Sequence, residues 1–405
     1  MELKPGYKQT EVGVIPEEWD VRCLDACVRT EAPICYGILM PGQHCDGGVP
    51  VVKVRDIVDG RIDESNLLLA HPSIDKAYRR SRLVVGDVLI TIRGTTGRVA
   101  RVSEPLNGAN ITQDTARARV TASASSDFIY FALQSNPLQQ QVALHTIGQA
   151  VKGINIRDVR RLALPIPHSL AEQRAIAAAL SDVDALLGGL DRLIAKKRDL
   201  KQAAMQQLLT GQTRLPGFLG EWRTKRLREV LRFQVGFPFS STFFSEEEQG
   251  VRLVKNRDLK SDDQIFHYSG KYESRFLVAN DDVLVGMDGD FLPCRWTKGP
   301  ALLNQRVGRV LPLRGLDRVF AYYFLIRPLK GIEVATSSTT VKHLSHGDVE
   351  GIEEQMPELE EQTAIAAVLS DMDAELSALE SRRDKTRALK QAMMQALLTG
   401  KIRLV

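Results

Sequence analysis

Four cysteines near the N-terminus are the first residues whose type could bind a metal. Cys23, Cys27, Cys35 and Cys45 stand together with His44, and thiolate and imidazole groups are ligands that zinc prefers. The gaps between successive cysteines hold three, seven and nine residues, so the close C-x2-C pair of most structural zinc sites is missing. Zinc remains the alternative, but we favour ordinary thiols and predict no metal site in this chain.

No spacing of residues in the sequence matches a common catalytic motif. The run from Gly148 to Gly153 is followed by Ile154, where a phosphate-binding loop requires lysine. A G-x-G-x-x-G loop, H-E-x-x-H and G-x-S-x-G are also missing. Asp288 and Asp290 form an isolated acidic pair that suits a turn better than a metal site. We therefore predict a binding protein and not an enzyme.

Composition narrows the class of protein further. The chain has 405 residues, 43% of them hydrophobic, and a formal net charge of +4. This length predicts two to four globular domains, and the charge permits a nucleic-acid partner without requiring one. No apolar run is long enough for a membrane helix and no secretory signal is recognisable. We therefore expect a cytoplasmic protein with no membrane association.

The strongest pattern in the sequence is an internal repeat. Residues 172–215 align without a gap to residues 361–404, at an offset of 189 residues. About 25 of the aligned positions are identical, far above the chance similarity between two helical segments. The chain therefore contains two copies of one element.

Each copy is predicted to form one long helix. Strong helix formers dominate both copies, prolines precede them, and Gly211 and Gly400 follow them. From residue 172 to 209, such a helix would be about 57 Å long. Its apolar residues alternate at spacings of four and three, the period of a coiled-coil seam. The predicted seam residues are Ile176, Leu180, Val183, Leu187, Leu190, Ile194, Ile365, Leu369, Met372, Leu376 and Leu379. We expect the two helices to pair with each other rather than to pack separately on their own domains.

The segments before the two helices repeat more weakly but in the same order. Residues 52–56, 87–89 and 128–133 are matched by residues 254–258, 282–284 and 320–325. Both segments contain alternating β-branched runs and aromatic residues that we expect in the core. The prediction is an α+β fold with two mixed, strand-rich domains and two long helices. The predicted boundaries are residues 1–165 and 216–356 for the domains, and 166–215 and 357–405 for the helical spacers.

These features together resemble the specificity subunit of Type I restriction-modification systems. The matching motifs are TEVGVIPEEW at residues 10–19, GDVLI at 86–90, a Pro-x-Pro…Glu-Gln junction at 165–173 and LLTG at 208–211. The second half repeats them as GEW, DDVL, Pro…Glu-Gln and LLTG. Each motif is weak alone, but their order, occurring twice, is specific, and the resemblance covers essentially the whole chain. Asp281 in place of Gly86 and Thr363 in place of Arg174 are modest departures.

The resemblance implies both a fold and a function. Each strand-rich domain would be a target recognition domain that reads one half of an asymmetric, bipartite sequence in double-stranded DNA. The helices would pair as an antiparallel coiled coil, giving circular pseudo-twofold symmetry with neighbouring chain ends. Two methyltransferase subunits would dock on the helices and methylate adenine, and restriction subunits would join them to cleave unmodified DNA. S-adenosylmethionine, ATP and magnesium would be bound by those partners, and no cofactor by this chain.

The length of the predicted helices agrees with such a function. Half-sites on one face of B-DNA lie about 34–36 Å apart, or a multiple of it, which a helix of about 57 Å can span. Lengthening the helices by one turn is expected to change the gap between half-sites and not their sequences. A self-sufficient bipartite DNA-binding regulator without methyltransferase partners is the main alternative, and an unrecognised nuclease is a third.

The expected DNA contacts are basic and small polar residues in predicted loops, because these side chains bind phosphates and read base edges. In the first domain they are Arg79, Arg80, Arg82, Arg93, Thr95, Thr96, Arg98, Lys152 and Asn155. In the second domain their counterparts are Arg275, Asp288, Asp290, Arg295, Thr340 and Lys342. For any single residue, a solvated surface charge is the simpler alternative. The loop at residues 94–97 is the strongest candidate, because its small side chains would let DNA approach the backbone.

Overall fold

The chain folds into two units. The computed structural model describes residues 5–149, 152–335 and 343–404. Unit 1 consists of Met1–Asp191 and Ser381–Val405, and unit 2 consists of Arg192–Glu380. Each unit therefore holds one strand-rich domain together with part of each long helix.

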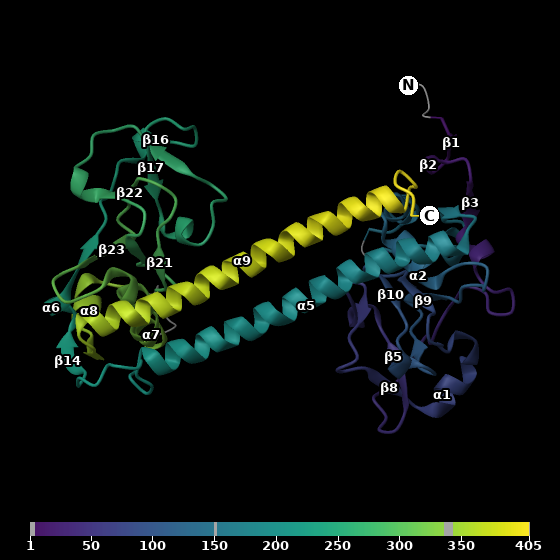
Figure 1. The fold of residues 1–405 in the computed structure, drawn as a ribbon, viewed down its shortest axis with the longest axis horizontal. Coiled ribbons are helices and arrows are strands. Elements are labelled where there is room, and N and C mark those ends of the chain that lie inside the picture. Colours follow the sequence, from purple (N-terminus) through teal and green to yellow (C-terminus); the bar gives the residue numbers. More distant parts are fainter. Residues whose placement is uncertain (1–4, 150–151, 336–342, 405) are drawn as a thin grey trace. The chain divides into compact units, whose positions relative to one another are not determined.

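The two sequence repeats form the two longest helices. They are α5 (Leu170–Leu208) and α9 (Leu359–Leu397), with 39 residues each, and Figure 1 shows both as continuous. Gly211 and Gly400 follow with φ of +71° and +69°, the left-handed conformation that glycine adopts without strain at a helix C-terminus. The predicted helices are confirmed, with boundaries within two residues of those expected.

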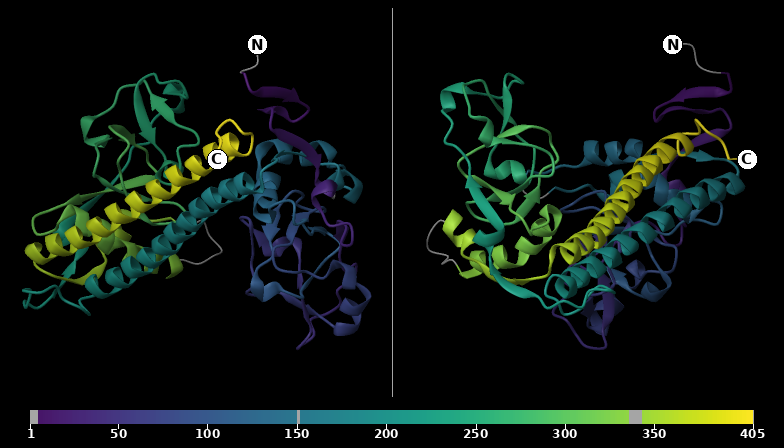
Figure 2. Two further views of the ribbon diagram at one scale, coloured as in Figure 1. Left: turned by 45° about the vertical axis from the view of Figure 1, so that its right-hand side comes forward. Right: turned by 60° about the vertical axis from the view of Figure 1, so that its left-hand side comes forward.

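Within each unit, α5 and α9 lie side by side and antiparallel (Figures 1 and 2). In unit 1 Asp184 of α5 pairs with Lys390 of α9, with 2.6 Å between Oδ1 and Nζ. In unit 2 the same pair recurs with the helices exchanged, between Lys201 and Asp373. These pairs relate residues at the offset of 189 seen in the sequence, so each unit repeats the helix packing of the other.

The predicted seam residues are buried or half-buried. Seven of them are at most 8% exposed, and they are Ile176, Leu180, Leu190, Ile194, Ile365, Leu369 and Leu376. Val183, Leu187, Met372 and Leu379 are half-buried. The first turns of each seam also join the core of a domain, since Ile176 and Leu180 belong to one hydrophobic cluster and Ile365 and Leu369 to another.

The Glu-Gln pair at the start of each repeat joins the helix to its domain. In unit 1 the Gln173 amide donates to the Pro167 carbonyl, and its oxygen accepts from the Ser125 backbone N–H. In unit 2 Gln362 makes the equivalent bonds with Pro357 and Asp317. A buried amide that satisfies backbone groups on two segments holds them in one geometry.

The domain of unit 1 is built on a four-stranded sheet in the order β10-β9-β12-β4 and a three-stranded sheet in the order β11-β5-β8. Pairs β1-β2, β3-β13 and β6-β7 complete it. The strands are β1 Tyr7–Thr10, β2 Gly13–Pro16, β3 Trp19–Cys23, β4 Cys35–Tyr36, β5 Val49–Val52, β6 Ile57–Val58, β7 Arg61–Ile62, β8 Leu68–Ala70, β9 Val88–Thr91, β10 Val99–Arg101, β11 Asn110–Ile111, β12 Thr115–Ala118 and β13 Ala163–Pro167. Its helices are α1 Pro72–Ala77, α2 Ser126–Gln134, α3 Asn136–His145 and α4 Ile156–Arg160.

The domain of unit 2 repeats this order of strands. Its four-stranded sheet runs β21-β20-β23-β15, beside a five-stranded sheet β16-β18-β17-β22-β19 and the pair β14-β24. The strands are β14 Arg223–Arg226, β15 Leu231–Val235, β16 Phe244–Ser245, β17 Val251–Val254, β18 Phe266–Tyr268, β19 Leu277–Val278, β20 Val283–Gly286, β21 Pro293–Arg295, β22 Ala301–Leu303, β23 Val307–Pro312 and β24 Glu353–Met356. Its helices are α6 Leu227–Val230, α7 Arg318–Ala335 and α8 His346–Glu350. The α+β fold with two strand-rich domains is confirmed.

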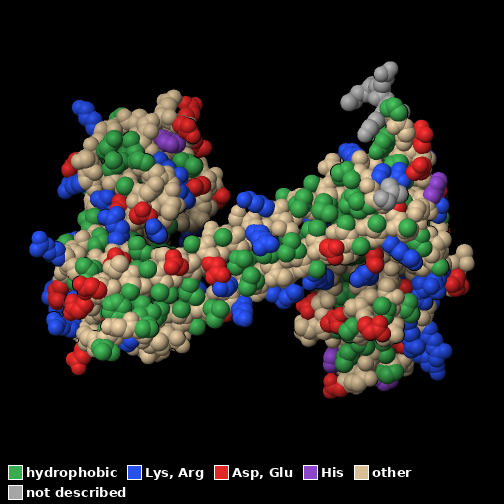
Figure 3. All heavy atoms as spheres, viewed as in Figure 1, with side chains coloured by type: hydrophobic (Ala, Val, Ile, Leu, Met, Phe, Trp, Pro, Cys, Tyr) green, Lys and Arg blue, Asp and Glu red, His purple; other side chains and the backbone are tan. Residues whose placement is uncertain are grey.

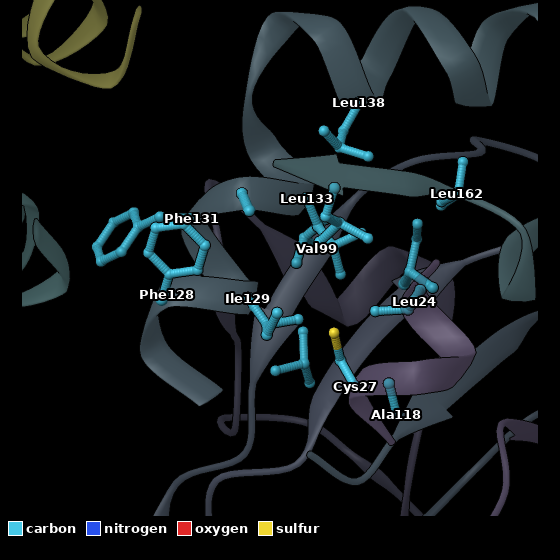
Figure 4. Packing of buried hydrophobic residues seen from close by; sticks show 14 of the residues in the cluster. Leu24, Cys27, Val99, Ala118, Phe128, Ile129, Phe131, Leu133, Leu138 and Leu162 are labelled. Atoms are coloured by element: carbon cyan, nitrogen blue, oxygen red, sulfur yellow. The ribbon is translucent and has the colours of Figure 1, made fainter. Parts of the chain in front are cut away.

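Aromatic residues of α2 and α7 pack into the domain cores, as predicted. In unit 1 Phe128 and Phe131 of α2 are at most 2% exposed and pack in one cluster with Leu24 and Cys27 (Figure 4). Burial raises the pKa of the Cys27 thiol to about 11, because the thiolate would lose its hydration there. Cys27 is thus an ordinary buried thiol.

In the part of the chain that the structure describes, no helix is both long and apolar enough to cross a membrane.

Candidate nucleic-acid interface

Five arginines of unit 1 line one pocket, which we call the arginine pocket. Its volume is about 480 Å³, and its lining consists of Glu31, Ala32, Pro33, Ile34, Cys35, Tyr36, Arg79, Arg80, Arg117, Arg119, Ile156 and Arg160. Strand pairing assembles it, because β12 places Arg117 directly opposite Cys35 of β4. The short 3-10 helix Arg79–Ser81 adds the first two arginines. Only Glu31 among the lining residues is acidic, so the pocket favours an anion.

A second pocket adjoins the first and contains three more predicted residues. Arg93, Lys152 and Asn155 line this pocket of about 640 Å³, which shares Tyr36 and Ile156 with the arginine pocket. The Arg93 backbone pairs with Gly153, and the Gly94 N–H donates to the Lys152 carbonyl at 2.9 Å. The structure thus brings five predicted residues, Arg79, Arg80, Arg93, Lys152 and Asn155, to one continuous surface. Figure 3 shows Lys and Arg side chains gathered at the edge of this unit, next to the part that holds α1.

Arg82 and Arg98 bind parts of their own domain. The Arg82 Nε donates to the buried Asp75 carboxylate at 2.8 Å, and Asp75 also accepts from Asn110 at 2.8 Å. Burial opposes ionisation of Asp75, but these hydrogen bonds hold its pKa below its usual value. The Arg98 guanidinium donates to the Ile57 carbonyl at 2.9 Å. Both side chains therefore stabilise the domain, whatever else they contact.

The threonines of the loop differ in their surroundings. The Thr96 hydroxyl lies 3.2 Å from the Thr146 hydroxyl, whereas Thr95 is exposed and its carbonyl accepts from Thr91. Gly94 and Gly97 both have positive φ, +74° and +84°, so the loop depends on glycine at both ends. The exposed part of this loop is the segment available to a ligand.

Sequence reasoning missed several residues of this surface. Tyr36 is 37% exposed between the two pockets, and the Arg80 guanidinium lies over its ring at 5.6 Å. Leu39 and Met40 are 50% and 83% exposed on the segment after β4. Arg160 donates to the Ile34 carbonyl at 2.9 Å. No sequence motif marks these residues, although an exposed aromatic next to arginine is typical of nucleic-acid surfaces.

Unit 2 carries different side chains at the equivalent positions. Asp288 occupies the place of Arg93, since each follows the second strand of its sheet and forms an isolated bridge to the segment before α8 or α4. The Asp288 carboxylate accepts from Arg306 at 3.2 Å and lies 2.9 Å from His343 Nδ1. The two domains thus share a backbone frame but present opposite charge at this point.

The other predicted residues of unit 2 do not form one cluster. Arg275 pairs with Glu273 at 2.9 Å. Asp290 and Arg295 line a pocket of about 710 Å³ whose wall includes α9, and Arg295 pairs there with Asp281 at 2.8 Å. Thr340 and Lys342 lie outside the described residues.

The pocket beside α9 has a counterpart beside α5, and we call the two the junction pockets. The pocket of unit 1 has about 740 Å³ and is lined by Ser181, Asp184 and Ala185 of α5 with Tyr130 and Phe131 of α2. The pocket of unit 2 is lined by Ser370, Asp373 and Ala374 of α9 with Tyr322 and Tyr323 of α7. The helix residues are identical in the two repeats, so each unit presents the same helix surface at an equivalent hollow.

The metal hypothesis for the cysteines has no support among the residues that the structure describes. No group of three or more His, Cys, Asp or Glu side chains there could hold a metal ion. Cys23 is exposed, Cys27 is buried, and Cys35, Cys45 and Cys294 are half-buried free thiols.

Comparison with known proteins identifies the family. A family model described as the Type I restriction modification DNA specificity domain matches residues 46–195 and 220–387. These two matches cover more than half of the chain, so the chain belongs to this family. It is a specificity subunit with DNA recognition domains and not a catalytic subunit, which confirms the resemblance inferred from the sequence.

Relatives of known kind agree. The chain is 25% identical over 98% of its length to a Methanocaldococcus jannaschii protein, provisionally named as the specificity subunit of type I restriction enzyme MjaX, and covers 96% of that protein. It is 28% identical over 52% of its length to the EcoBI specificity subunit of Escherichia coli, covering 44% of that chain. The fold matches the S subunit from M. genitalium with a TM-score of 0.60 at 15% identity, over 98% of both chains. It also matches a chain from a type I R-M system with a TM-score of 0.58 at 19% identity, over 96% of this chain and 99% of that chain.

Proposed function

We propose that each domain reads one half of an asymmetric, bipartite DNA sequence, with the paired helices setting the distance between the halves. The observation that carries this proposal is the contrast within the chain. The two units share the order of their strands and the packing of their helices, while equivalent surface positions carry Arg93 in one and Asp288 in the other. One frame with two different surfaces is what recognition of two unlike sequences requires.

We assign residues 1–165 and 216–356 as the target recognition domains and residues 166–215 and 357–405 as the spacers. In the first domain the proposed DNA surface comprises Arg79, Arg80, Arg93, Lys152 and Asn155 with the exposed loop at Thr95. Arginine and lysine would contact phosphates there, and asparagine and threonine can read base edges. In the second domain we retain Arg275, Asp288, Asp290, Arg295, Thr340 and Lys342 as candidates.

Two methyltransferase subunits, in this proposal, dock on the repeated helices, and restriction subunits join them. The junction pockets support this arrangement, because each exposes the same serine, aspartate and alanine of the repeat at a hollow between helix and domain. Identical docking surfaces suit two copies of one partner, placed once per half-site. S-adenosylmethionine, ATP and magnesium would be bound by those partners.

Methylome mapping of the host, with and without the gene for this chain, tests the proposal. We expect one bipartite adenine-methylation motif to disappear with the gene. Purification of the tagged chain from the host separates the alternatives, since a self-sufficient DNA-binding regulator would carry no methyltransferase. If the host expresses the chain and its methylome is the same with and without the gene, the proposal is contradicted.

Exchange of one domain tests its modularity. Replacing residues 20–160 with the corresponding segment of another specificity subunit should change one half of the methylated motif and leave the other half and the gap intact. The matched control replaces the equivalent segment of the second domain and should change the other half. Modular reading is wrong if either exchange alters both halves.

A further inference from the structure

The arginine pocket of unit 1 contains a buried cation that its own domain does not neutralise. Arg117 is 1% exposed, and its Nη2 donates to the Pro33 carbonyl at 3.1 Å and approaches the Cys35 sulfur at 3.4 Å. Its Nε and Nη1 have no hydrogen-bond partner among the described residues. A buried guanidinium with unsatisfied donors is costly unless an anion or another acceptor compensates it.

In unit 2 the equivalent arginine, Arg309, has hydrogen-bond acceptors for its guanidinium nitrogens. Arg309 of β23 lies opposite Gln234 of β15, as Arg117 of β12 lies opposite Cys35 of β4. The Gln234 amide oxygen accepts from Arg309 Nη2 at 2.6 Å and from Nε at 3.1 Å, and Asp282 accepts from Nη1 at 3.2 Å. Unit 1 therefore has a thiol where unit 2 has a glutamine that accepts two hydrogen bonds from the arginine.

The carboxylate equivalent to Asp282 is engaged elsewhere in unit 1. Asp87 accepts two bonds from Arg119, each at 2.9 Å, and this pairing raises the pKa of Arg119. Asp25 lies 3.6 Å from Arg160 and is partly exposed. These two carboxylates offset two of the five arginines, and Glu31 is the one acidic side chain in the lining. The pocket thus keeps an excess of positive charge above Arg117.

We propose that the arginine pocket binds a phosphate group of the DNA backbone and that only the first domain has this anchor. Arginine is the side chain best suited to phosphate, because its planar donors match the geometry of the oxyanion. The pocket shares Tyr36 and Ile156 with the pocket that holds Arg93, Lys152 and Asn155, so a phosphate there would be continuous with the proposed DNA surface. The assignment of the phosphate to the DNA backbone rests on the proposed DNA-reading function. The binding of an anion in the pocket does not depend on that function.

The decisive variant is Cys35→Gln, which copies the arrangement of unit 2. Glutamine at this position would accept a hydrogen bond from the unpaired donors of Arg117, as Gln234 does from Arg309, and would occupy the place of the phosphate without deleting an arginine. Arg160→Gln is the second variant, and it removes a charge from the half-exposed rim without cutting into the core. Arg55→Gln is the charge-matched control, since its side chain is 70% exposed and lies outside both pockets.

Two measurements on the full chain with its co-purifying partners test the proposal. The first is the salt dependence of target binding, where both pocket variants should lower the slope of log K against log salt by about one unit and Arg55→Gln should leave it unchanged. The second is a titration with inorganic phosphate, against potassium chloride of equal ionic strength, followed by thermal unfolding. Phosphate should raise the melting temperature of the wild type and of Arg55→Gln, but not that of Cys35→Gln.

The outcomes distinguish three questions: whether the pocket binds an anion, whether that anion is a DNA phosphate, and whether the chain reads DNA. A phosphate effect that Cys35→Gln removes, with an unchanged DNA slope, would overturn the DNA assignment and leave a site for a small free anion. Unchanged behaviour of both pocket variants in both measurements would overturn the anion pocket. Failure of the wild type to bind the mapped target would instead refute the proposed function, and the phosphate titration would still report on the pocket.

Discussion

At the scale of residues, the difference between a surface arginine and a structural arginine lies in contacts that the sequence does not show. Arg79, Arg80 and Arg82 look alike in the chain, but only Arg82 binds a buried carboxylate, Asp75. Asp75 is 0% exposed and also receives the Asn110 amide. Arg82 therefore has a structural role that its neighbours lack.

Replacing Asp75 with asparagine is expected to lower the free energy of unfolding of unit 1 by about 1–3 kcal/mol at pH 7, because the hydrogen bonds from Arg82 and Asn110 lose a buried, charged acceptor. The pKa of Asp75 is lowered in the fold, so its contribution is present above the ordinary aspartate pKa, about 4. It is lost as the pH falls through the lower folded value. The stability difference between wild type and Asp75→Asn should therefore shrink at pH 3.

Urea unfolding followed by tryptophan fluorescence measures this effect in one unit. Trp19 lies in unit 1, and Trp222 and Trp296 lie in unit 2, so a background with both of the latter changed to phenylalanine reports unit 1 alone. Asp63→Asn, at an exposed loop position, is the matched control and should cost much less. Equal losses for the two variants would contradict the structural role of Asp75.

The site was only partly predictable from the sequence, for a physical reason. Arg79 stands out because it belongs to a basic run, and Arg93 because it directly precedes the loop at residues 94–97 with its two glycines. Arg117 and Cys35 are 82 residues apart, and only the register of β12 on β4 makes them face each other. Strand register depends on packing across the whole domain, so neither the pocket nor its unsatisfied charge follows from local pattern.

At the scale of elements, an ion pair fixes the start of each long helix to the segment after the other one. Glu172 at the start of α5 binds Arg403 through both carboxylate oxygens, and Glu361 at the start of α9 binds Arg214 in the same way. The glutamate side chains are 2% and 4% exposed. Glu361 also accepts from Trp222 Nε1 at 3.2 Å, a contact that Trp19 does not repeat among the described residues.

Arg403→Met should therefore destabilise unit 1 by roughly 3–5 kcal/mol, because it leaves a buried carboxylate without its cation. Arg214→Met should destabilise unit 2 by about 1 kcal/mol less, since the Trp222 hydrogen bond remains. Hydrogen exchange of the two units, measured in each variant, checks both the size and the location of the loss. Glu172→Gln combined with Arg403→Met should recover part of the stability, and no recovery would contradict the pairing.

The elements were largely predictable, because the signals that define them are local or repeated. The long helices follow from propensity, a 3.5-residue period and terminal glycine, and the β-branched runs of the two domains correspond to strands such as β5 and β17. α7 runs for 18 residues and continues past Pro328, where proline would ordinarily kink or end a helix, so its length was not predictable. The sheet order was not predictable, since it depends on pairing between distant segments.

At the scale of the whole molecule, the proposed function depends on the length and the phase of the paired helices. Inserting three heptads into both α5 and α9, at equivalent positions of the repeat, would add about 31 Å, close to one turn of B-DNA. We expect the gap in the methylated motif to grow by about nine base pairs with both half-sites unchanged. Methylome sequencing of cells that carry the variant measures the new gap.

One inserted heptad is the control for phase. It adds about 10 Å, roughly a third of a DNA turn, and would set the two half-sites on different faces of the duplex. Methylation of any bipartite motif should then fall sharply. A gap that stays constant in the three-heptad variant, with methylation intact, would mean that the helices do not set the distance.

The division of the chain into units has a consequence for its synthesis on the ribosome. The ion pair of unit 2 joins residues 147 apart, whereas that of unit 1 joins residues 231 apart. Unit 2 is one continuous segment, but unit 1 needs Ser381–Val405, which are translated after all of unit 2. The domain made first is therefore the one completed last. In the nascent chain, Glu172 at the start of α5 lacks its ion pair until Arg403 has left the exit tunnel.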